Sequence, residues 1–301
     1  MPFLFRILNK GASARVASKW DNYRSASDFW LIPAIQEEWN RKITGDKNLV
    51  YEEYVCDKYL KGRDGLEILS IGCGNGIHER PFARYNSTFK ITGVDLASAQ
   101  IEQAKTIAAE QELSINYISG DFTKMDFKEG TFDMVLFHSS LHHFSNIRDF
   151  LKDYVKPLLK DRGILVAFEY AGPNRLQLKK SQLTAANAIL KQIPEEYKTL
   201  YDGKTIKKKV YRPGLLRMLL VDPSEAPDSE NLVQGIHDNF SVVEEVRLGW
   251  NITHLLLKGI SHNFINYSGE TQSLLTDIIR QEDEFVMQTG ENDAIFGVYK
   301  K

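Results

Sequence analysis

The sequence predicts an α/β protein with a mainly parallel sheet, and two observations support this. Between residues 66 and 169, short apolar segments alternate with segments of helical spacing. The first apolar segment runs directly into a turn with three glycines, Gly72, Gly74 and Gly76. Strands separated by helices are joined by right-handed crossovers, which align the strands in parallel. A glycine turn at the carboxyl end of such a strand is where open α/β sheets hold nucleotide-like cofactors.

The first half of the predicted sheet consists of three strands and two intervening helices. Apolar residues recur at a helical spacing in the second of these helices, at Ile101, Ala104 and Ala108. The expected strands are 66–71, 89–95 and 115–118, and the expected helices are the stretch from Gly76 to about 85 and 97–112.

The second half continues the alternation and then loses it. We expect strands over 132–137 and 163–168, with a helix over 150–159 between them. Beyond residue 170 helical patterns dominate, and Ser229 stands where the N-cap of a helix reaching His237 would be. The remaining expected elements are a helix over 176–193, a strand over 240–248, a mostly helical stretch over 252–289 and a last strand over 294–299.

This pattern suggests a helical extension followed by one large domain. Residues 1–62 form the aromatic-rich extension or cap, and residues 63–301 form the domain, with helical inserts at 171–238 and 252–289. Insertions of this length are usually functional. The first twenty residues are basic and partly apolar. They fit a targeting segment, an interfacial segment or an arm packed on the domain.

Composition excludes several classes of protein. The chain has 301 residues, of which 43% are hydrophobic and 26% charged, as in soluble globular proteins. The net charge of −2 provides no basic field for nucleic acid, so DNA is not an expected partner. Two cysteines cannot form a disulfide framework, which favours a cytoplasmic location. No apolar stretch approaches the ~20 residues of a membrane-spanning helix, so stable membrane insertion is not expected.

Further polar residues follow the other strands at the same edge of the predicted sheet. Asp95 closes the second strand, where an acid can accept hydrogen bonds from a ribose diol. After the third strand, Asp121 can accept from an adenine amino group and Phe122 can pack on the ring. The segment 138–144 follows the fourth strand and contains His138, His142 and His143.

The spacing of the glycines separates two classes of cofactor. A nicotinamide-binding domain prefers G-x-G-x-x-G, whereas here the third glycine comes one residue earlier. The tighter loop suits a cofactor without a diphosphate. Together these motifs resemble the class I S-adenosylmethionine-dependent methyltransferases, small-molecule branch, whose loop reads G-C-G-x-G. The Leu-His-His-Phe after the fourth strand is similar to that branch as well.

The resemblance implies a Rossmann-like, doubly wound, seven-stranded sheet with an antiparallel terminal strand. It also implies S-adenosylmethionine as cofactor, with the glycines close to its methionine part, Asp95 on the ribose and His138 beside the sulfonium. The cofactor-binding residues carried over in this way are Gly72, Cys73, Gly74, Gly76, Asp95, Leu96, Gly120, Asp121, Phe122 and His138.

One position departs from the family pattern. The family usually has an acid two residues before the first glycine, where this chain has Ser70. That acid helps to order the amino-acid end of the cofactor. Glu79, in the first helix, is a candidate replacement, and a solvated helix face is an equally good interpretation because glutamates are mostly exposed.

Methyl transfer requires alignment of the reactants and often removal of a proton from the acceptor. His142, Glu169 and Tyr170 stand at strand ends where such a base would be. In the pair His142 and His143, one ring can instead be structural and form a hydrogen bond with the backbone of its own loop. No acid clusters with His138, His142 or His143, and no carboxylate-rich site is visible, so no metal is expected.

The expected function is methyl transfer to oxygen or nitrogen of a small molecule in a lidded pocket. The first insert and the N-terminal helices would enclose this pocket, with Tyr23, Trp30 and Tyr170 in its lining. Two alternatives stay open: a protein or RNA methyltransferase with an open acceptor face, and a cofactor-binding module without catalysis, which Ser70 favours. The sequence does not identify the acceptor, and a homodimer remains open.

Overall fold

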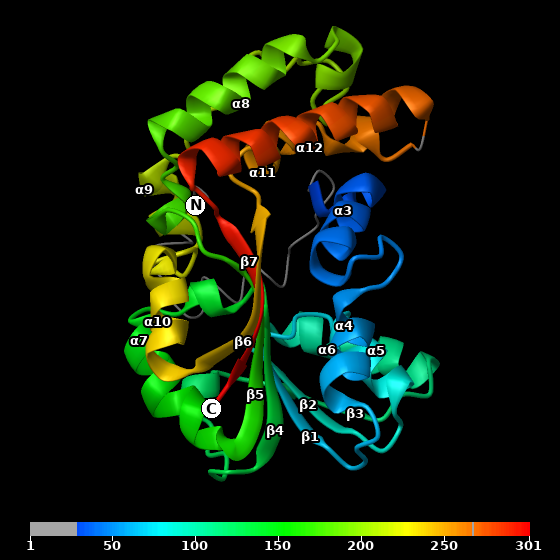
Figure 1. Cartoon of the computed structure of the whole chain (residues 1–301), viewed down its shortest axis with the longest axis vertical. Coiled ribbons are helices and arrows are strands. Elements are labelled where there is room, and N and C mark those ends of the chain that lie inside the picture. The colour runs from blue at the N-terminus through cyan, green and yellow to red at the C-terminus, as the bar shows by residue number, and fades with distance from the viewer. Residues whose placement is uncertain (1–28, 267) are drawn as a thin grey trace, which may run out of the picture.

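The centre of the molecule is a seven-stranded sheet with the order β3-β2-β1-β4-β5-β7-β6 (Figure 1). The computed structural model describes residues 29–266 and 268–301. Neighbouring strands from β3 to β5 are parallel, whereas β7 is antiparallel to both β5 and β6. This confirms the predicted fold class. The strands are β1 Glu67–Ile71, β2 Lys90–Asp95, β3 Ile115–Ser119, β4 Phe132–His138, β5 Leu159–Tyr170, β6 Ser241–Gly249 and β7 Ala294–Lys300.

Helices cover both faces of this sheet (Figure 1). Helices α3 to α6 lie on one face, and α7 and α10 lie on the other. The α-helices are α3 Pro33–Thr44, α4 Tyr51–Val55, α5 Glu79–Tyr85, α6 Ser98–Glu110, α7 Ile147–Phe150, α8 Lys180–Gln192, α9 Leu215–Val221, α10 Leu232–Asn239, α11 Thr253–Leu257 and α12 Gly269–Thr289.

The alternation of side chains along β5 explains why both faces are covered. Val166 and Phe168 belong to the hydrophobic cluster on the side of α3, α4 and α5. Leu165 and Ala167 belong to the cluster on the side of α7 and α10. Successive side chains of a strand point to opposite faces, so a strand buried on both faces is apolar throughout.

The two helical inserts meet beyond one end of the sheet. Helices α8, α11 and α12 lie together at the top of the molecule in Figure 1, and both α11 and α12 contact α8. Their buried residues include Leu190, Leu256 and Ile278, which share one hydrophobic cluster with Trp39 of α3. The inserts therefore continue the core of the sheet domain, together with the described part of the N-terminal extension.

The structure corrects two local predictions. Ser229 is not the N-cap of a helix, because its hydroxyl donates to the carbonyl of Gly172 at 2.8 Å and so attaches the insert to the end of β5. A 3-10 turn, Ser229–Asn231, precedes α10 instead. The helix expected over 150–159 is divided into α7, a π-turn and a 3-10 turn. Strand β5 already begins at Leu159, which pairs with Phe132 of β4.

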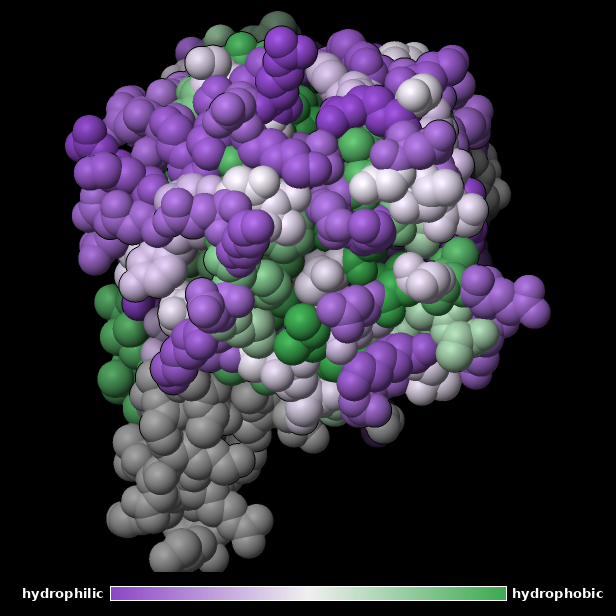
Figure 2. Space-filling view, turned by 90° about the horizontal axis from the view of Figure 1, so that it is seen from below, coloured by the Kyte–Doolittle hydropathy of each residue, from purple (hydrophilic) through white to green (hydrophobic). Residues whose placement is uncertain are grey.

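The surface is polar at the end away from the carboxyl ends of the parallel strands. Figure 2 shows this end mostly covered by hydrophilic side chains, with apolar residues scattered between them. Among residues 29–266 and 268–301, no helix is long and apolar enough to span a membrane. The expectations for the first twenty residues lie outside the described residues.

Asp293, which precedes β7, provides a pH-dependent test of this packing. Its carboxylate is buried and accepts hydrogen bonds from Gln182 Nε2 at 3.0 and 2.9 Å. Burial raises the pKa of Asp293 from 3.8 to about 7. Between these two values the folded state keeps a proton that the unfolded chain has lost, so stability falls as pH rises through this window.

Asp293→Asn removes this titration while keeping the size of the side chain. We expect the free energy of unfolding of the variant, relative to the wild type, to increase from pH 4 to pH 7, as measured by urea unfolding at each pH. A difference that stays constant over this range would contradict the assignment to Asp293.

Candidate functional site

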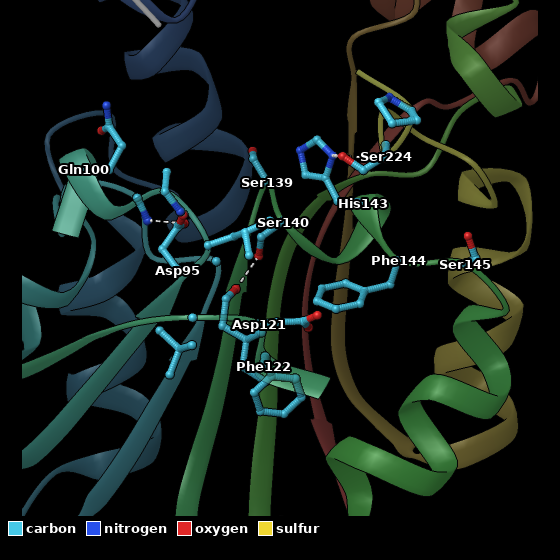
Figure 3. Close-up of a pocket in the computed structure, with 18 residues that line it drawn as sticks. Asp95, Gln100, Asp121, Phe122, Ser139, Ser140, His143, Phe144, Ser145 and Ser224 are labelled. Carbon is cyan, nitrogen blue, oxygen red and sulfur yellow. Dashed lines mark hydrogen bonds between the residues drawn. The ribbon is translucent and has the colours of Figure 1, made fainter. Parts of the chain in front are cut away.

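A cavity of about 360 Å³ lies at the carboxyl ends of β1, β2, β3 and β4 (Figure 3). Strand β1 lies between β2 and β4, so the strand order reverses here, and ligands of open α/β sheets bind at such a point. The predicted cofactor-binding residues that line the cavity are Gly72, Gly74, Asp95, Leu96, Gly120, Asp121 and Phe122.

Glycine is required in the loop after β1 because the backbone is left-handed there and because neighbouring side chains leave no room for a Cβ. Gly72 and Gly76 have φ of +76° and +74°, and both are tightly enclosed. A Cβ on Gly72 would lie 2.5 Å from Cβ of Ser140, and a Cβ on Gly76 would lie 2.2 Å from the hydroxyl of Tyr117. Gly74 has nothing within 4 Å of the equivalent position. The loop therefore packs closely on two sides and leaves its backbone open at Gly74.

Asp95 connects the end of β2 to the glycine loop. Its Oδ2 accepts the N–H of Gly74 at 2.8 Å, and its Oδ1 accepts the N–H of Ala97 at 2.7 Å. Both are charge-assisted hydrogen bonds, which fix the carboxylate at the wall of the cavity. In Figure 3 Asp95 lies across the cavity from His143 and Ser224.

Asp121 and Phe122 form the next part of the wall, after β3. Asp121 accepts hydrogen bonds from the N–H of Thr123 at 3.2 Å and from its hydroxyl at 2.7 Å, and Lys124 lies 3.1 Å away. Partial burial raises the pKa of Asp121, but the bonds from Thr123 and Lys124 outweigh burial and hold the pKa below its ordinary value. Asp121 is therefore an anionic acceptor at neutral pH.

The serine pair Ser139 and Ser140 lies in the predicted segment 138–144, but neither serine was predicted as a site residue. Ser139 lines the cavity with a left-handed φ of +51°, which is unfavourable for a residue other than glycine. Among the described residues its buried hydroxyl has no hydrogen-bond partner. Ser140 Oγ donates to the carbonyl of Ile71 at 2.6 Å and so joins the loops after β4 and β1. The other lining residues, none of them predicted to bind the cofactor, are Ile71, Val94, Ala97, Gln100, His143, Phe144, Ser145, Pro223 and Ser224.

Three predicted cofactor residues do not line the cavity. Gly76 lies beneath Tyr117, and Cys73 is buried, which raises the pKa of its thiol well above the ordinary value. His138 is stacked between His78 and Phe168, with ring centroids 3.3 and 4.7 Å away. Burial holds the pKa of His138 well below its ordinary value, so its imidazole is neutral.

Of the residues predicted to be catalytic, Glu169 holds the loop after β4, which contains His142. Glu169 is fully buried and accepts the N–H of Ser140 at 2.7 Å and that of Leu141 at 2.6 Å. Its other oxygen lies 2.7 Å from Nδ1 of His142. The hydroxyl of Tyr170 donates to the carbonyl of Pro173 at 3.0 Å. His142, Glu169 and Tyr170 are thus close to the cavity, but none of the three lines it.

The first insert reaches the cavity through a turn at residues 222–226. Pro223 and Ser224 line the cavity, and Nδ1 of His143 lies 3.1 Å from the carbonyl oxygen of Ser224 and 3.2 Å from its hydroxyl. Trp30, expected in the lining of the acceptor pocket, packs against Trp39 and Trp250. Tyr23 lies outside the described residues.

Ser70 and Glu79 form a buried pair behind the glycine loop. Ser70 Oγ donates to Glu79 Oε1 at 2.5 Å, and Glu79 is only 1% exposed. Among the described residues no hydrogen-bond partner contacts Glu79 Oε2. Burial raises the pKa of Glu79, against the hydrogen bond from Ser70. The solvated helix face considered for Glu79 is therefore wrong.

The arrangement fits a nucleoside cofactor. The cavity has the size of a small-ligand pocket. It combines an open glycine backbone, a carboxylate at the end of β2 and a second acceptor beside an aromatic ring after β3. Fold and site together define a Rossmann-like protein that binds a nucleoside cofactor without a diphosphate.

Comparison with known proteins agrees with this class. A family described as "Methyltransferase domain" matches residues 68–163. A ubiquinone biosynthesis O-methyltransferase of Bartonella bacilliformis is 31% identical over 225 residues, which cover 72% of this chain and 86% of that protein. A ubiquinone biosynthesis O-methyltransferase from Maricaulis maris is 38% identical over 117 residues, but this match covers only 45% of the length of the Maricaulis protein.

Among solved structures, geranyl diphosphate C-methyltransferase from Streptomyces coelicolor A3(2) has the same fold. The TM-score is 0.56 at 15% identity, covering 97% of this chain and 98% of that one. The chain belongs to the class I S-adenosylmethionine-dependent methyltransferases.

Proposed function

We propose that the protein transfers a methyl group from S-adenosylmethionine to an oxygen atom of a small molecule. The main support is that Pro223 and Ser224 of the insert line the same cavity as the glycine loop, as expected of a lid over a small acceptor. The names of the Bartonella and Maricaulis relatives favour oxygen over nitrogen. An intermediate of ubiquinone biosynthesis is therefore the first acceptor to test.

The chain's own residues would position the reactants and remove the proton of the acceptor. The cofactor supplies an activated methyl group on its sulfonium when it is bound. Glu169 fixes Nδ1 of His142, which leaves Nε2 as the nitrogen that can accept a proton. Nε2 lies 3.8 Å from a carboxylate oxygen of Glu225 in the insert. Access of an acceptor to His142 therefore depends on the position of the insert.

The test has two stages. Calorimetric titration with S-adenosylhomocysteine measures cofactor binding, and absence of binding would overturn the proposal. Radiolabelled S-adenosylmethionine is then offered with hydroxylated aromatic small molecules, including ubiquinone precursors, and separately with protein and RNA extracts. Label in the small molecules supports the proposal. Label only in protein or RNA would favour a macromolecular acceptor, and cofactor binding without any transfer would favour a non-catalytic module.

Glu79 is proposed to replace the acid that the family has at the position of Ser70. A hydrogen bond to a charged group contributes about 1.5–3 kcal/mol. We therefore expect Glu79→Gln to weaken binding of S-adenosylhomocysteine about tenfold or more, as measured by calorimetry. Binding of 5′-methylthioadenosine, which lacks the amino-acid end, should not change.

The same comparison separates a direct role from a structural one. If Glu79 only supports the glycine loop, both ligands should lose affinity to the same extent. The double variant Ser70→Asp/Glu79→Gln returns the acid to the usual family position, and we expect it to recover part of the lost affinity for S-adenosylhomocysteine.

A further inference from the structure

Three metal-ligating side chains meet where the first insert contacts the loop after β4. His143, Asp222 and Glu225 each offer one donor atom, and these atoms lie within 4.8 Å of one another. About eighty residues separate His143 from the other two along the chain. No metal was expected from the sequence because no acid clusters with the histidines, but the fold brings two acids to them.

The turn that carries the two acids is held in place by hydrogen bonds. Asp222 follows the last residue of α9 and is 3% exposed, and its Oδ1 accepts the N–H of Ser224 at 3.0 Å and the hydroxyl at 2.6 Å. Arg175 Nη1 donates to the carbonyls of Pro223 at 2.6 Å and Glu225 at 3.1 Å. Metal ligands in proteins are usually oriented by such outer partners.

The charges at this junction favour a cation. Asp222 and Glu225 lie beside His143, and Glu225 also lies 3.8 Å from His142, whose other nitrogen contacts Glu169. Three carboxylates are thus gathered around two imidazoles in a poorly exposed place. Buried carboxylates are stabilised by opposite charge or by metal coordination.

We propose that His143, Asp222 and Glu225 bind a divalent cation at the wall of the cofactor cavity. A site of one imidazole and two carboxylates suits Mn²⁺, Fe²⁺ or Zn²⁺. Metal–ligand bonds of about 2.0–2.2 Å place ligand atoms roughly 3–4.4 Å apart. The three donor atoms already lie within 4.8 Å of one another. His143 and Ser224 face each other across this junction in Figure 3, so the cation would connect the insert to the loop after β4.

Three protein ligands leave coordination positions for other groups. If the proposed function is correct, an oxygen of the acceptor would occupy one of them, and the cation would favour its deprotonated form. This consequence rests on the proposed function, whereas binding of the cation does not.

The test is a titration of the full chain with Mn²⁺ alone. Binding is measured by electron paramagnetic resonance of the free ion and by calorimetry. We expect one site. Glu225→Gln, which leaves the hydrogen bonds of the turn in place, should weaken Mn²⁺ binding more than about tenfold, since even outer-shell partners contribute tenfold. Asp222→Asn should have a similar effect. Glu230→Gln, an exposed position in the same insert, is the matched control and should bind Mn²⁺ like the wild type.

Absence of a Mn²⁺ site in the wild type, or wild-type affinity for Mn²⁺ in both Glu225→Gln and Asp222→Asn, would overturn the cation proposal. In that case the three side chains form only a polar contact between the insert and the loop. Binding of S-adenosylhomocysteine, measured on the same samples, keeps the two proposals separate. A chain that binds S-adenosylhomocysteine but not Mn²⁺ contradicts the cation site alone, and the reverse result contradicts the proposed function alone.

Discussion

Gly72→Ala is expected to destabilise the protein strongly and to abolish cofactor binding. The new Cβ would lie 2.5 Å from Cβ and 3.1 Å from Oγ of Ser140, on a backbone with φ of +76°. Overpacking costs about 1–3 kcal/mol, and the left-handed backbone costs a further ~1–2 kcal/mol for alanine. Ser140 cannot retreat easily, because its hydroxyl is bonded to Ile71 and its N–H to Glu169. Urea unfolding and titration with S-adenosylhomocysteine measure the two effects.

Gly130→Ala separates backbone strain from the steric clash. Gly130 has a similar φ of +64° but nothing within 4 Å of the added Cβ. We expect this variant to lose only the ~1–2 kcal/mol of the left-handed backbone and to bind cofactor normally. Equal destabilisation by the two substitutions would show that contact with Ser140 is not what requires glycine at position 72.

The parts of the structure that depend on local sequence could be predicted. Local sequence patterns located all seven strands, although β5 begins earlier than expected. Gly72, Gly74, Asp95 and Asp121 follow directly from these strands, because the carboxyl ends of parallel strands meet at one edge.

Parts that depend on distant contacts could not be predicted. The sequence leaves Glu79 open between a cofactor-binding acid and a solvated side chain, and only its contact with Ser70 reveals a buried pair. The positive φ of Ser139 leaves no mark in composition. The approach of Asp222 to His143 requires knowing how the insert folds back over the loop. Such contacts are set by tertiary packing, which periodicity does not encode.

The second large effect is expected at Glu169, which holds the loop after β4 from the end of β5. Glu169→Ala leaves the N–H groups of Ser140 and Leu141 buried and unpaired, and His142 without its partner. Each unpaired group costs about 1–3 kcal/mol, so we expect a loss of about 3–5 kcal/mol in the free energy of unfolding. Urea unfolding measures it, and a loss below 1 kcal/mol would contradict this role of Glu169.

Glu169→Gln tests whether the same side chain also sets the state of His142. An amide oxygen in place of Oε1 still accepts the two N–H groups, so the fold and cofactor affinity should be largely kept. The amide nitrogen would then donate to Nδ1 of His142, which moves the ring proton to Nε2 and removes the lone pair needed for a base. If His142 accepts the proton of the acceptor, turnover should fall by orders of magnitude while affinity for S-adenosylhomocysteine stays unchanged, as for other histidine bases whose partner acid becomes an amide. Unchanged turnover in a folded Glu169→Gln variant would instead mean that Glu169 and His142 only shape the loop.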